Sequence, residues 1–190
     1  KVSHWHSKIS FKNPRSKGTW DWHQDFGHWY REGCLNPDML SIGIAISPMT
    51  EENGSLKFIK SSHKFGRIDH MATGSSNSAD PEYVAEALKK YEVQPCLLDP
   101  GDAVVFHCNL LHGSGPNPTN MPRSLIICSY NALDNDPWKP IDPGHHSQEI
   151  QTLPDDKLIK GEWVSLMGES KLLNLDGADV YGYDYGSESN

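Results

Sequence analysis

The sequence has little cysteine, no excess of positive charge and no long hydrophobic run. Its 4 cysteines, among 190 residues, show no C-x-x-C spacing, so a cysteine-bound zinc site is not indicated. Lys and Arg number 17 against 25 Asp and Glu, and the net charge of −8 argues against nucleic acid or an anionic membrane surface as a partner. The apolar runs are far shorter than the roughly 20 residues of a membrane span. We therefore expect an intracellular, cytoplasmic protein, and its oligomeric state stays open.

The chain opens on Lys1 in strand-like sequence, with neither an initiating methionine nor a signal peptide. We expect a single domain over residues 1–190 that is truncated at its N-terminus. Its β-rich core should cover about residues 1–135, and a C-terminal extension should cover about residues 136–190.

Apolar and polar residues alternate with a period of two along most of the chain, which indicates a β-rich domain. The alternation is clearest at 39–46, where bulky residues should face a core and small residues should leave room for a ligand. Short strands, one helix and long connections predict a sandwich or barrel such as a double-stranded β-helix. Further strands are expected at 4–11, 19–25, 103–108, 123–130 and 55–59, the last in a hairpin after Asn53-Gly54. The helix is expected from Asp80 to about Tyr91, after a loop at 61–80 whose His63 and His70 we interpret as surface or loop histidines.

Three residues from two distant parts of the sequence form a candidate metal site. His23 and Asp25 should share one face of the strand at 19–25 while Gln24 points away, and His112 follows a strand much later in the chain. Two histidines and one carboxylate can occupy one face of an octahedral metal and leave other positions open, as in non-haem Fe(II) oxygenases. A histidine hydrogen-bonded to a nearby carboxylate is the simpler alternative for the H-x-D motif alone.

The residues around the third ligand favour His112 over its rival His107, because Gly113 and Ser114 follow it and leave space beside a ligand. Arg123 then enters an apolar strand, where a cation is costly unless it is paired. Its guanidinium could bind a dicarboxylate co-substrate through two hydrogen bonds, or it could pair with an acidic residue of this chain.

An ordered set of motifs resembles the phytanoyl-CoA dioxygenase family, and its ectoine hydroxylase branch in particular. The resemblance spans roughly residues 4–135 and depends on the order of the motifs, since none is specific alone. The motifs are His23-Gln-Asp, Glu52-Asn-Gly-Ser-Leu-Lys-Phe-Ile-Lys-Ser-Ser-His63-Lys, Pro100-Gly-Asp, His112-Gly-Ser, Pro122-Arg123-Ser and Tyr130-Asn-Ala.

The resemblance implies a mainly β protein, a double-stranded β-helix (jelly-roll, cupin-like) with a few short helices. It implies an Fe(II)- and 2-oxoglutarate-dependent dioxygenase that uses O2 to hydroxylate an unactivated C–H bond of a small-molecule substrate, with release of succinate and CO2. His23, Asp25 and His112 would be the catalytic iron ligands. A carboxylate at Asp25 resembles the hydroxylases of this superfamily, because related halogenases have a small residue there.

The same resemblance implies further roles for individual residues. Arg123 would bind the distal carboxylate of 2-oxoglutarate, with the Ser114 hydroxyl assisting, and Ser10 falls where the ectoine branch has an amide that also contacts the co-substrate. Positions that approach the substrate in the ectoine branch correspond to His6, Lys8, Trp29, Met39 and Ser41.

The chain departs from the family pattern at two places. Lys60-Ser-Ser-His63 replaces the usual Pro-Gly-Ser-His, and from the resemblance we expect that this sequence lacks the N-terminal part of the family domain. Two other classes of function stay open: a non-redox metal-dependent enzyme, and a catalytically silent binding module on the same fold. A protein-modifying oxygenase also stays open, whereas the acidic charge disfavours one that acts on nucleic acid.

Overall fold

The computed structural model describes residues 1–73, 76–139, 148–152 and 154–156. Contacts divide the chain into two units, Lys1–Ile150 and Gln151–Asn190, and the first contains the elements discussed below. The extension predicted over about residues 136–190 lies largely outside the described residues.

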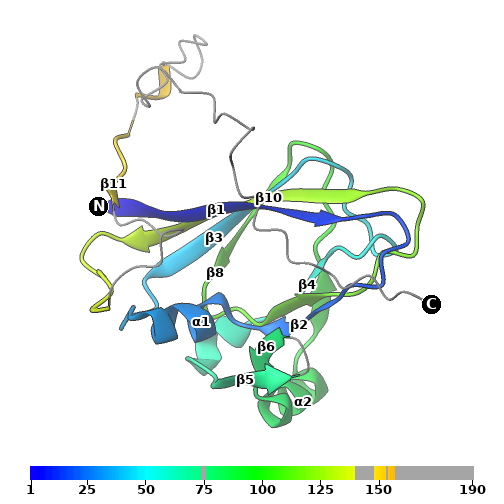
Figure 1. The fold of residues 1–190 in the computed structure, drawn as a ribbon, viewed down its shortest axis with the longest axis horizontal. Coiled ribbons are helices and arrows are strands. Elements are labelled where there is room, and N and C mark those ends of the chain that lie inside the picture. Colours follow the sequence, from blue (N-terminus) through cyan, green and yellow to red (C-terminus); the bar gives the residue numbers. More distant parts are fainter. Residues whose placement is uncertain (74–75, 140–147, 153, 157–190) are drawn as a thin grey trace, which may run out of the picture. The chain divides into compact units, whose positions relative to one another are not determined.

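Two antiparallel sheets form the body of the first unit, and Figure 1 shows the larger sheet above the smaller one. The larger has the strand order β11-β1-β10-β3-β8, and the smaller has the order β2-β9-β4-β7. This architecture confirms the predicted double-stranded β-helix. The strands of the larger sheet are β1 (Val2–Lys12), β3 (Met39–Ala45), β8 (Ala103–His107), β10 (Arg123–Ala132) and β11 (Gln148–Glu149). Those of the smaller are β2 (Trp20–His23), β4 (Leu56–Ile59), β7 (Val93–Pro95) and β9 (His112–Ser114).

The region predicted as a long loop at 61–80 contains regular structure. A 3₁₀ turn, η1 (Ser62–Phe65), is followed by a separate two-stranded sheet of β5 (His70–Thr73) and β6 (Ser76–Ala79). These short elements lack a hydrophobic period, so no sequence pattern indicates them. The helix α2 (Pro81–Lys90) follows as predicted, with the Asp80 side chain accepting a hydrogen bond from the Glu82 amide at its N-terminus.

The helix α1 (Asp25–Glu32) was not predicted, because its sequence continues the aromatic-rich strand before it. It ends at Gly33, whose φ of 114° is the left-handed conformation that glycine adopts readily at a helix C-terminus. Neither α1 nor α2 is long and apolar enough to cross a bilayer, and no other helix in the described part of the chain is either.

The Asn53-Gly54 turn exists, but the hairpin predicted around it is wrong. The strand before the turn, β3, pairs with β8 and β10, whereas the strand after it, β4, pairs with β7 and β9. The turn therefore connects the two sheets. Asn53 stabilises it by accepting a hydrogen bond from the Thr50 amide and donating one to the Pro48 carbonyl.

The alternation along β3 is real, but the core lies on the face opposite to the one predicted. Ser41 and Gly43 face inward and are buried, whereas Leu40 and Ile44 are each 36 % exposed on the outer face. A Cβ at Gly43 would lie 3.3 Å from a methyl group of Val104 and 3.4 Å from the methyl groups of Leu125, so these neighbours leave little room for a larger residue. Periodicity shows that the two faces differ, but the opposite sheet decides which face is buried.

Three clusters of buried apolar side chains hold these elements together. One lies between the sheets, one packs α1 against the larger sheet, and one packs α2 and β6 beside β4. The cluster at α1 fixes the helix whose first residue is Asp25. Its members are Trp5, Phe26, Trp29, Cys34, Met39 and Cys108.

Candidate metal centre

Three side chains from different elements meet at one end of the β2–β9 strand pair. His23 is the last residue of β2, Asp25 is the first residue of α1, and His112 is the first residue of β9. His23 and His112 are opposite each other across the antiparallel pair, and their ring centroids are 4.1 Å apart. One ligand atom of each of the three residues lies within 4.8 Å of the other two. Within the described ranges, this is the one such group of three His, Cys, Asp or Glu residues.

Asp25 reaches this position by a route that differs from the prediction. The strand ends at His23, and Gln24 (φ −112°, ψ 134°) connects it to α1. The two side chains therefore meet across a strand-to-helix junction and do not share one face of a continuous strand. A carboxylate in the first turn of a helix is also favoured by the unpaired amide groups at the helix N-terminus.

Both histidines present Nε2 to the centre. The Nδ1 of His23 lies 2.7 Å from the Asp21 carbonyl, and the Nδ1 of His112 lies 2.9 Å from the Leu110 carbonyl. A carbonyl can only accept, so each Nδ1 carries a proton and donates, which leaves Nε2 as the ring atom available to bind a metal. Burial, and next the charge of His112, lower the pKa of His23 to about 3, so this ring is neutral at pH 7.

The two oxygens of Asp25 have different partners. Oδ1 lies 3.7 Å from Nε2 of His112, and Oδ2 accepts a hydrogen bond of 2.9 Å from the Ser41 hydroxyl. Burial raises the pKa of Asp25, but the neighbouring His112, Lys8 and His23 and the hydrogen bond from Ser41 favour the carboxylate more strongly, and the net pKa is lowered. The residue is a carboxylate at neutral pH, oriented with one oxygen toward the histidines.

This donor set fits a divalent transition metal. Two neutral imidazoles and one carboxylate suit Fe(II), and three ligands on one side leave coordination positions for other groups. Each donor is oriented by a second hydrogen bond, from His23 to Asp21, from His112 to Leu110 and from Ser41 to Asp25. Such outer hydrogen bonds are typical of protein metal sites, because they fix the tautomer and the direction of each ligand.

Arg123 is fully buried at the start of β10 and has no acidic partner in the part of the chain that the structure describes. Its Nη1 donates to the Ser10 hydroxyl at 3.0 Å, while Nε and Nη2 have no hydrogen-bond partner. The buried Ser114 hydroxyl, two residues after His112, also lacks a partner. Burial lowers the pKa of Arg123 to about 10, which still leaves it charged at neutral pH. Unpaired buried donors of this kind fit an anion.

Lys12 is a second buried cation beside Arg123 that the sequence reasoning missed. The two residues are cross-strand partners in the β1–β10 pair, and Lys12 is 4 % exposed. Its Nζ donates to the carbonyls of Gly18 and Gly115, which ties β1 to the segments next to β2 and β9. Burial and the charge of Arg123 lower the pKa of Lys12 to about 8. Alternation could have found Lys12, because it lies two residues after Ser10 on the same face.

The five predicted substrate-facing residues occupy unlike surroundings. Trp29 and Met39 are buried in the α1 cluster, and Ser41 is fully buried with its hydroxyl on Asp25. Lys8 is exposed and its charge acts on Asp25, while the His6 ring lies edge-on to Trp29 with centroids 5.8 Å apart. Their contact with a substrate stays a prediction.

His70 is a buried residue next to the metal-binding segment that sequence reasoning placed at the surface or in a loop. It is 3 % exposed, and its Nε2 accepts a 2.9 Å hydrogen bond from the backbone amide of Gln24, the residue between His23 and Asp25. Its Nδ1 donates to the Ile68 carbonyl at 2.9 Å. The ring is therefore neutral and held in a single tautomer.

Acidification should unfold the protein partly through His70. Burial, together with the charges of His28, Arg31 and Arg67, lowers its pKa to about 4 although the bond to Ile68 raises it. The unfolded chain, with an ordinary pKa near 6.5, binds this proton first. Stability should therefore fall as pH decreases from about 6.5 to about 4. Denaturant unfolding of metal-free protein at pH 7 and pH 5 should show a smaller loss for His70→Gln than for the wild type. An equal loss in both proteins would contradict the assignment.

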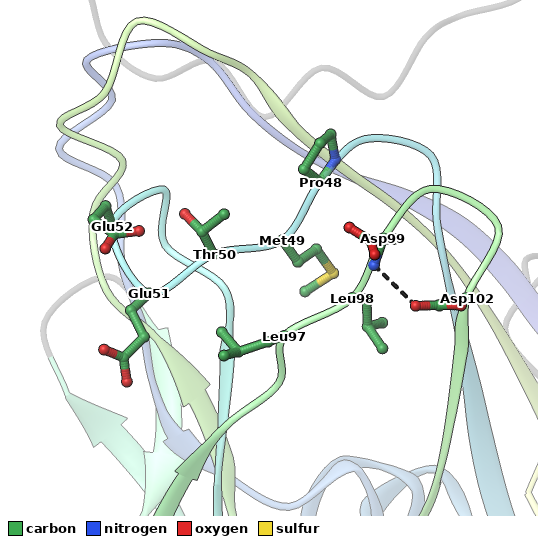
Figure 2. Close-up of a pocket in the computed structure, with 9 residues that line it drawn as sticks. All are labelled: Pro48, Met49, Thr50, Glu51, Glu52, Leu97, Leu98, Asp99 and Asp102. Atoms are coloured by element: carbon green, nitrogen blue, oxygen red, sulfur yellow. Dashed lines mark hydrogen bonds between the residues drawn. The ribbon is translucent and has the colours of Figure 1, made fainter.

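The rival ligand and the surface pocket lie away from this centre. His107 is exposed, its Nδ1 accepts a hydrogen bond from the Asn109 amide, and its ring lies 5.9 Å from that of His63. A pocket of about 410 Å³ lies between the turns that precede β4 and β8, and Figure 2 shows the side chains that line it. None of the predicted site residues lines it. Its lining is Pro48, Met49, Thr50, Glu51, Glu52, Leu97, Leu98, Asp99 and Asp102.

Known proteins are similar to this chain in sequence and in fold. Residues 1–125 match the family model "Phytanoyl-CoA dioxygenase (PhyH)". An L-proline trans-4-hydroxylase from Streptomyces griseoviridis is 31 % identical over 72 % of this chain and 57 % of its own length. An ectoine dioxygenase from Sphingopyxis alaskensis is 32 % identical over 70 % of this chain and 48 % of its own length.

A solved structure has the same fold. The crystal structure of EctD from S. alaskensis with 2-oxoglutarate and 5-hydroxyectoine superposes with a TM-score of 0.63 at 27 % identity. The match covers 72 % of this chain and 46 % of that chain. The chain thus spans about half the length of the curated relatives it matches.

Proposed function

The chain belongs to the phytanoyl-CoA dioxygenase family, and on that premise we propose that it is part of an Fe(II)- and 2-oxoglutarate-dependent dioxygenase. The proposed reaction hydroxylates an unactivated C–H bond of a small molecule. Substrate, O2 and 2-oxoglutarate become hydroxylated product, succinate and CO2. The observation that carries this proposal is the convergence of His23, Asp25 and His112 within 4.8 Å of one another.

The buried cation at Arg123 supports a dicarboxylate co-substrate. Two of its guanidinium nitrogens and the Ser114 hydroxyl are buried without partners, so a carboxylate there would satisfy donors that are costly to leave unpaired. Lys12 adds positive charge beside the same position. A non-redox metal enzyme has no need of such a dicarboxylate anchor, so this feature favours an oxygenase over a hydrolase with the same three ligands.

Each residue then has a distinct task. His23, Asp25 and His112 would hold the metal through two Nε2 atoms and one carboxylate oxygen, and Ser41 keeps that carboxylate from rotating. Bound iron of this kind supplies the oxidative chemistry, with O2 and a 2-oxo acid as its reactants. Arg123 would pair with the distal carboxylate through two parallel hydrogen bonds, which fixes both position and orientation of the co-substrate.

The substrate is proposed to be a small molecule that carries a carboxylate. Lys8 is an exposed cation whose charge acts on Asp25, and His6, two residues before Lys8 in β1, forms an edge-on ring pair with Trp29 of α1. The names of the relatives, an ectoine dioxygenase and a proline hydroxylase, support the same class. We propose an intracellular, cytoplasmic location, which four free cysteines support, and neither nucleic acid nor a membrane as partner.

Anaerobic and aerobic turnover assays test the proposed reaction. Purified protein with Fe(II), 2-oxoglutarate and O2 should release succinate even without the prime substrate, at a reduced rate. Addition of proline, ectoine or related carboxylates one by one should raise that rate for a substrate, with a product that is one oxygen atom heavier by mass spectrometry. Turnover that needs no O2 and proceeds with Zn(II) would instead indicate a non-redox metal enzyme. The absence of both metal and 2-oxoglutarate binding would indicate a silent binding module.

A further inference from the structure

The residue between two of the metal ligands is held at every hydrogen-bonding atom of its side chain. Gln24 is fully buried, and its Nε2 donates to the carbonyls of Gly66 and Asn109 at 2.8 Å and 2.7 Å. Its Oε1 accepts from the Ile68 amide at 2.7 Å. Gln24 thus connects the strand-to-helix junction to two segments, one before β5 and one before β9.

His70 holds the backbone of the same residue. Its Nε2 accepts from the Gln24 amide, and its own position is fixed by the bond from Nδ1 to Ile68 and by Arg31, which donates to the His70 carbonyl. The ring lies directly over Gly27 of α1, where a Cβ would overlap it. Only glycine leaves room for the ring at this position, although glycine in a helix interior costs roughly 1 kcal/mol of helix stability.

These contacts matter because α1 has no side-chain cap of its own at its N-terminus. The amide of Phe26 is held by the Cys108 carbonyl at 3.0 Å, and the amide of Gln24 is held by His70 at 2.9 Å. If His70 lost its acceptor, the buried Gln24 amide would lack a partner, and the junction would have to move to find one. Any such movement changes the separation of His23 from Asp25, which flank the junction.

We propose that His70 is a positioning residue of the metal centre, which acts through the Gln24 peptide and sets the geometry of His23 and Asp25. This inference depends on the metal site of the proposed function. His70 itself does not belong to the ligand group, since it bonds Gln24 and Ile68. Outer-shell partners of metal ligands typically contribute about 10- to 100-fold to metal affinity, and we expect His70 to fall in this range.

Metal binding by three variants tests the proposal. His70→Phe keeps a ring over Gly27 but removes both hydrogen bonds, and should raise the Kd for Mn(II) by about 10- to 100-fold in calorimetry. His70→Gln keeps an acceptor for the Gln24 amide, and should bind Mn(II) within about threefold of the wild type, a difference below about 1 kcal/mol. Val84→Ala is the matched control: it removes buried apolar volume from the cluster of α2 and β6, so it should lower stability without changing the Kd.

The outcomes distinguish failure of the proposed metal centre from failure of the positioning role of His70. If the wild type binds no Mn(II) while His23→Ala behaves identically, the proposed metal centre fails and this inference fails with it. If the wild type binds Mn(II) and His70→Phe binds it equally well, the metal centre stands and the positioning role is refuted. An equal loss of affinity in His70→Phe and Val84→Ala would also refute it, because reduced stability alone would then explain both. The electron paramagnetic resonance spectrum of bound Mn(II) should change in His70→Phe and remain unchanged in Val84→Ala.

Discussion

An Asp25→Asn variant should lose both metal binding and 2-oxoglutarate turnover, with Mn(II) affinity reduced by more than about 100-fold. The amide is nearly the same size and can still accept from Ser41, which donates to Oδ2 at 2.9 Å. What it removes is the negative charge beside the two imidazoles. An attraction between unit charges about 4 Å apart amounts to about 4 kcal/mol at an effective dielectric constant of 20, and a divalent cation doubles it. Each 1.4 kcal/mol corresponds to about tenfold in affinity, so this loss far exceeds that expected for the His70 variants.

Glu51→Gln is a suitable control for Asp25→Asn, because it neutralises one exposed carboxylate in the connection between β3 and β4. It should leave Mn(II) affinity and succinate release at wild-type values. Thermal unfolding of metal-free Asp25→Asn should show that the variant still folds. Asp25→Asn protein that keeps wild-type Mn(II) affinity would exclude Asp25 as a ligand and remove the basis of the proposed function.

Local sequence patterns were sufficient to predict most strands and α2. They failed for features that depend on tertiary contacts, such as which face of a strand is buried. Alternation places the strand at Met39 correctly, since neighbouring residues on a strand face opposite sides whatever lies around them. It cannot say which side faces the second sheet. The small residues Ser41 and Gly43 face inward, where the Ser129 hydroxyl and the Leu125 side chain of the adjacent strand β10 lie beside them.

For the three candidate metal ligands, too, the sequence indicated which residues belong together but not the local structure that brings them together. The motif order indicated His23, Asp25 and His112 as a set, and the structure brings them together through the β2–β9 pair. The local geometry given for the first two was wrong, because α1 begins at Asp25. A helix of only eight residues with an interior glycine has weak propensity, and its tertiary contacts stabilise it.

His70 and Lys12 mark the limit of sequence reasoning at this site. Nothing in the non-periodic stretch before α2 distinguishes His70 from a surface histidine, since its partner Gln24 lies 46 residues away in the chain. Lys12 was recoverable in principle from its position on the face of Ser10. Its burial depends on the segments around Gly18 and Gly115, which alternation does not describe.

Replacing Arg123 with Leu should raise the KM for 2-oxoglutarate by at least about 100-fold while Mn(II) affinity stays near the wild-type value. Charge-assisted hydrogen bonds contribute about 1.5–3 kcal/mol each, and a bidentate pair would lose two of them. Arg123→Lys should recover only part of this loss, because an ammonium group cannot donate two parallel hydrogen bonds. Arg15→Leu, which removes an arginine that bonds Asn120 at the surface, should leave the KM unchanged.

A co-substrate without the second carboxylate isolates the contact. The ratio of wild-type to Arg123→Leu turnover should be large for 2-oxoglutarate and close to one for 2-oxopentanoate, which lacks the distal carboxylate. The stability of the variant gives an independent check. Arg123 is a buried charge whose Nε and Nη2 have no partner, so the metal-free Leu variant should be as stable as the wild type or more stable. Two results together would contradict this role: a marked loss of stability in Arg123→Leu, and a ratio of wild-type to variant turnover that is the same for both oxo acids. Arg123 would then stabilise the fold and bind no co-substrate.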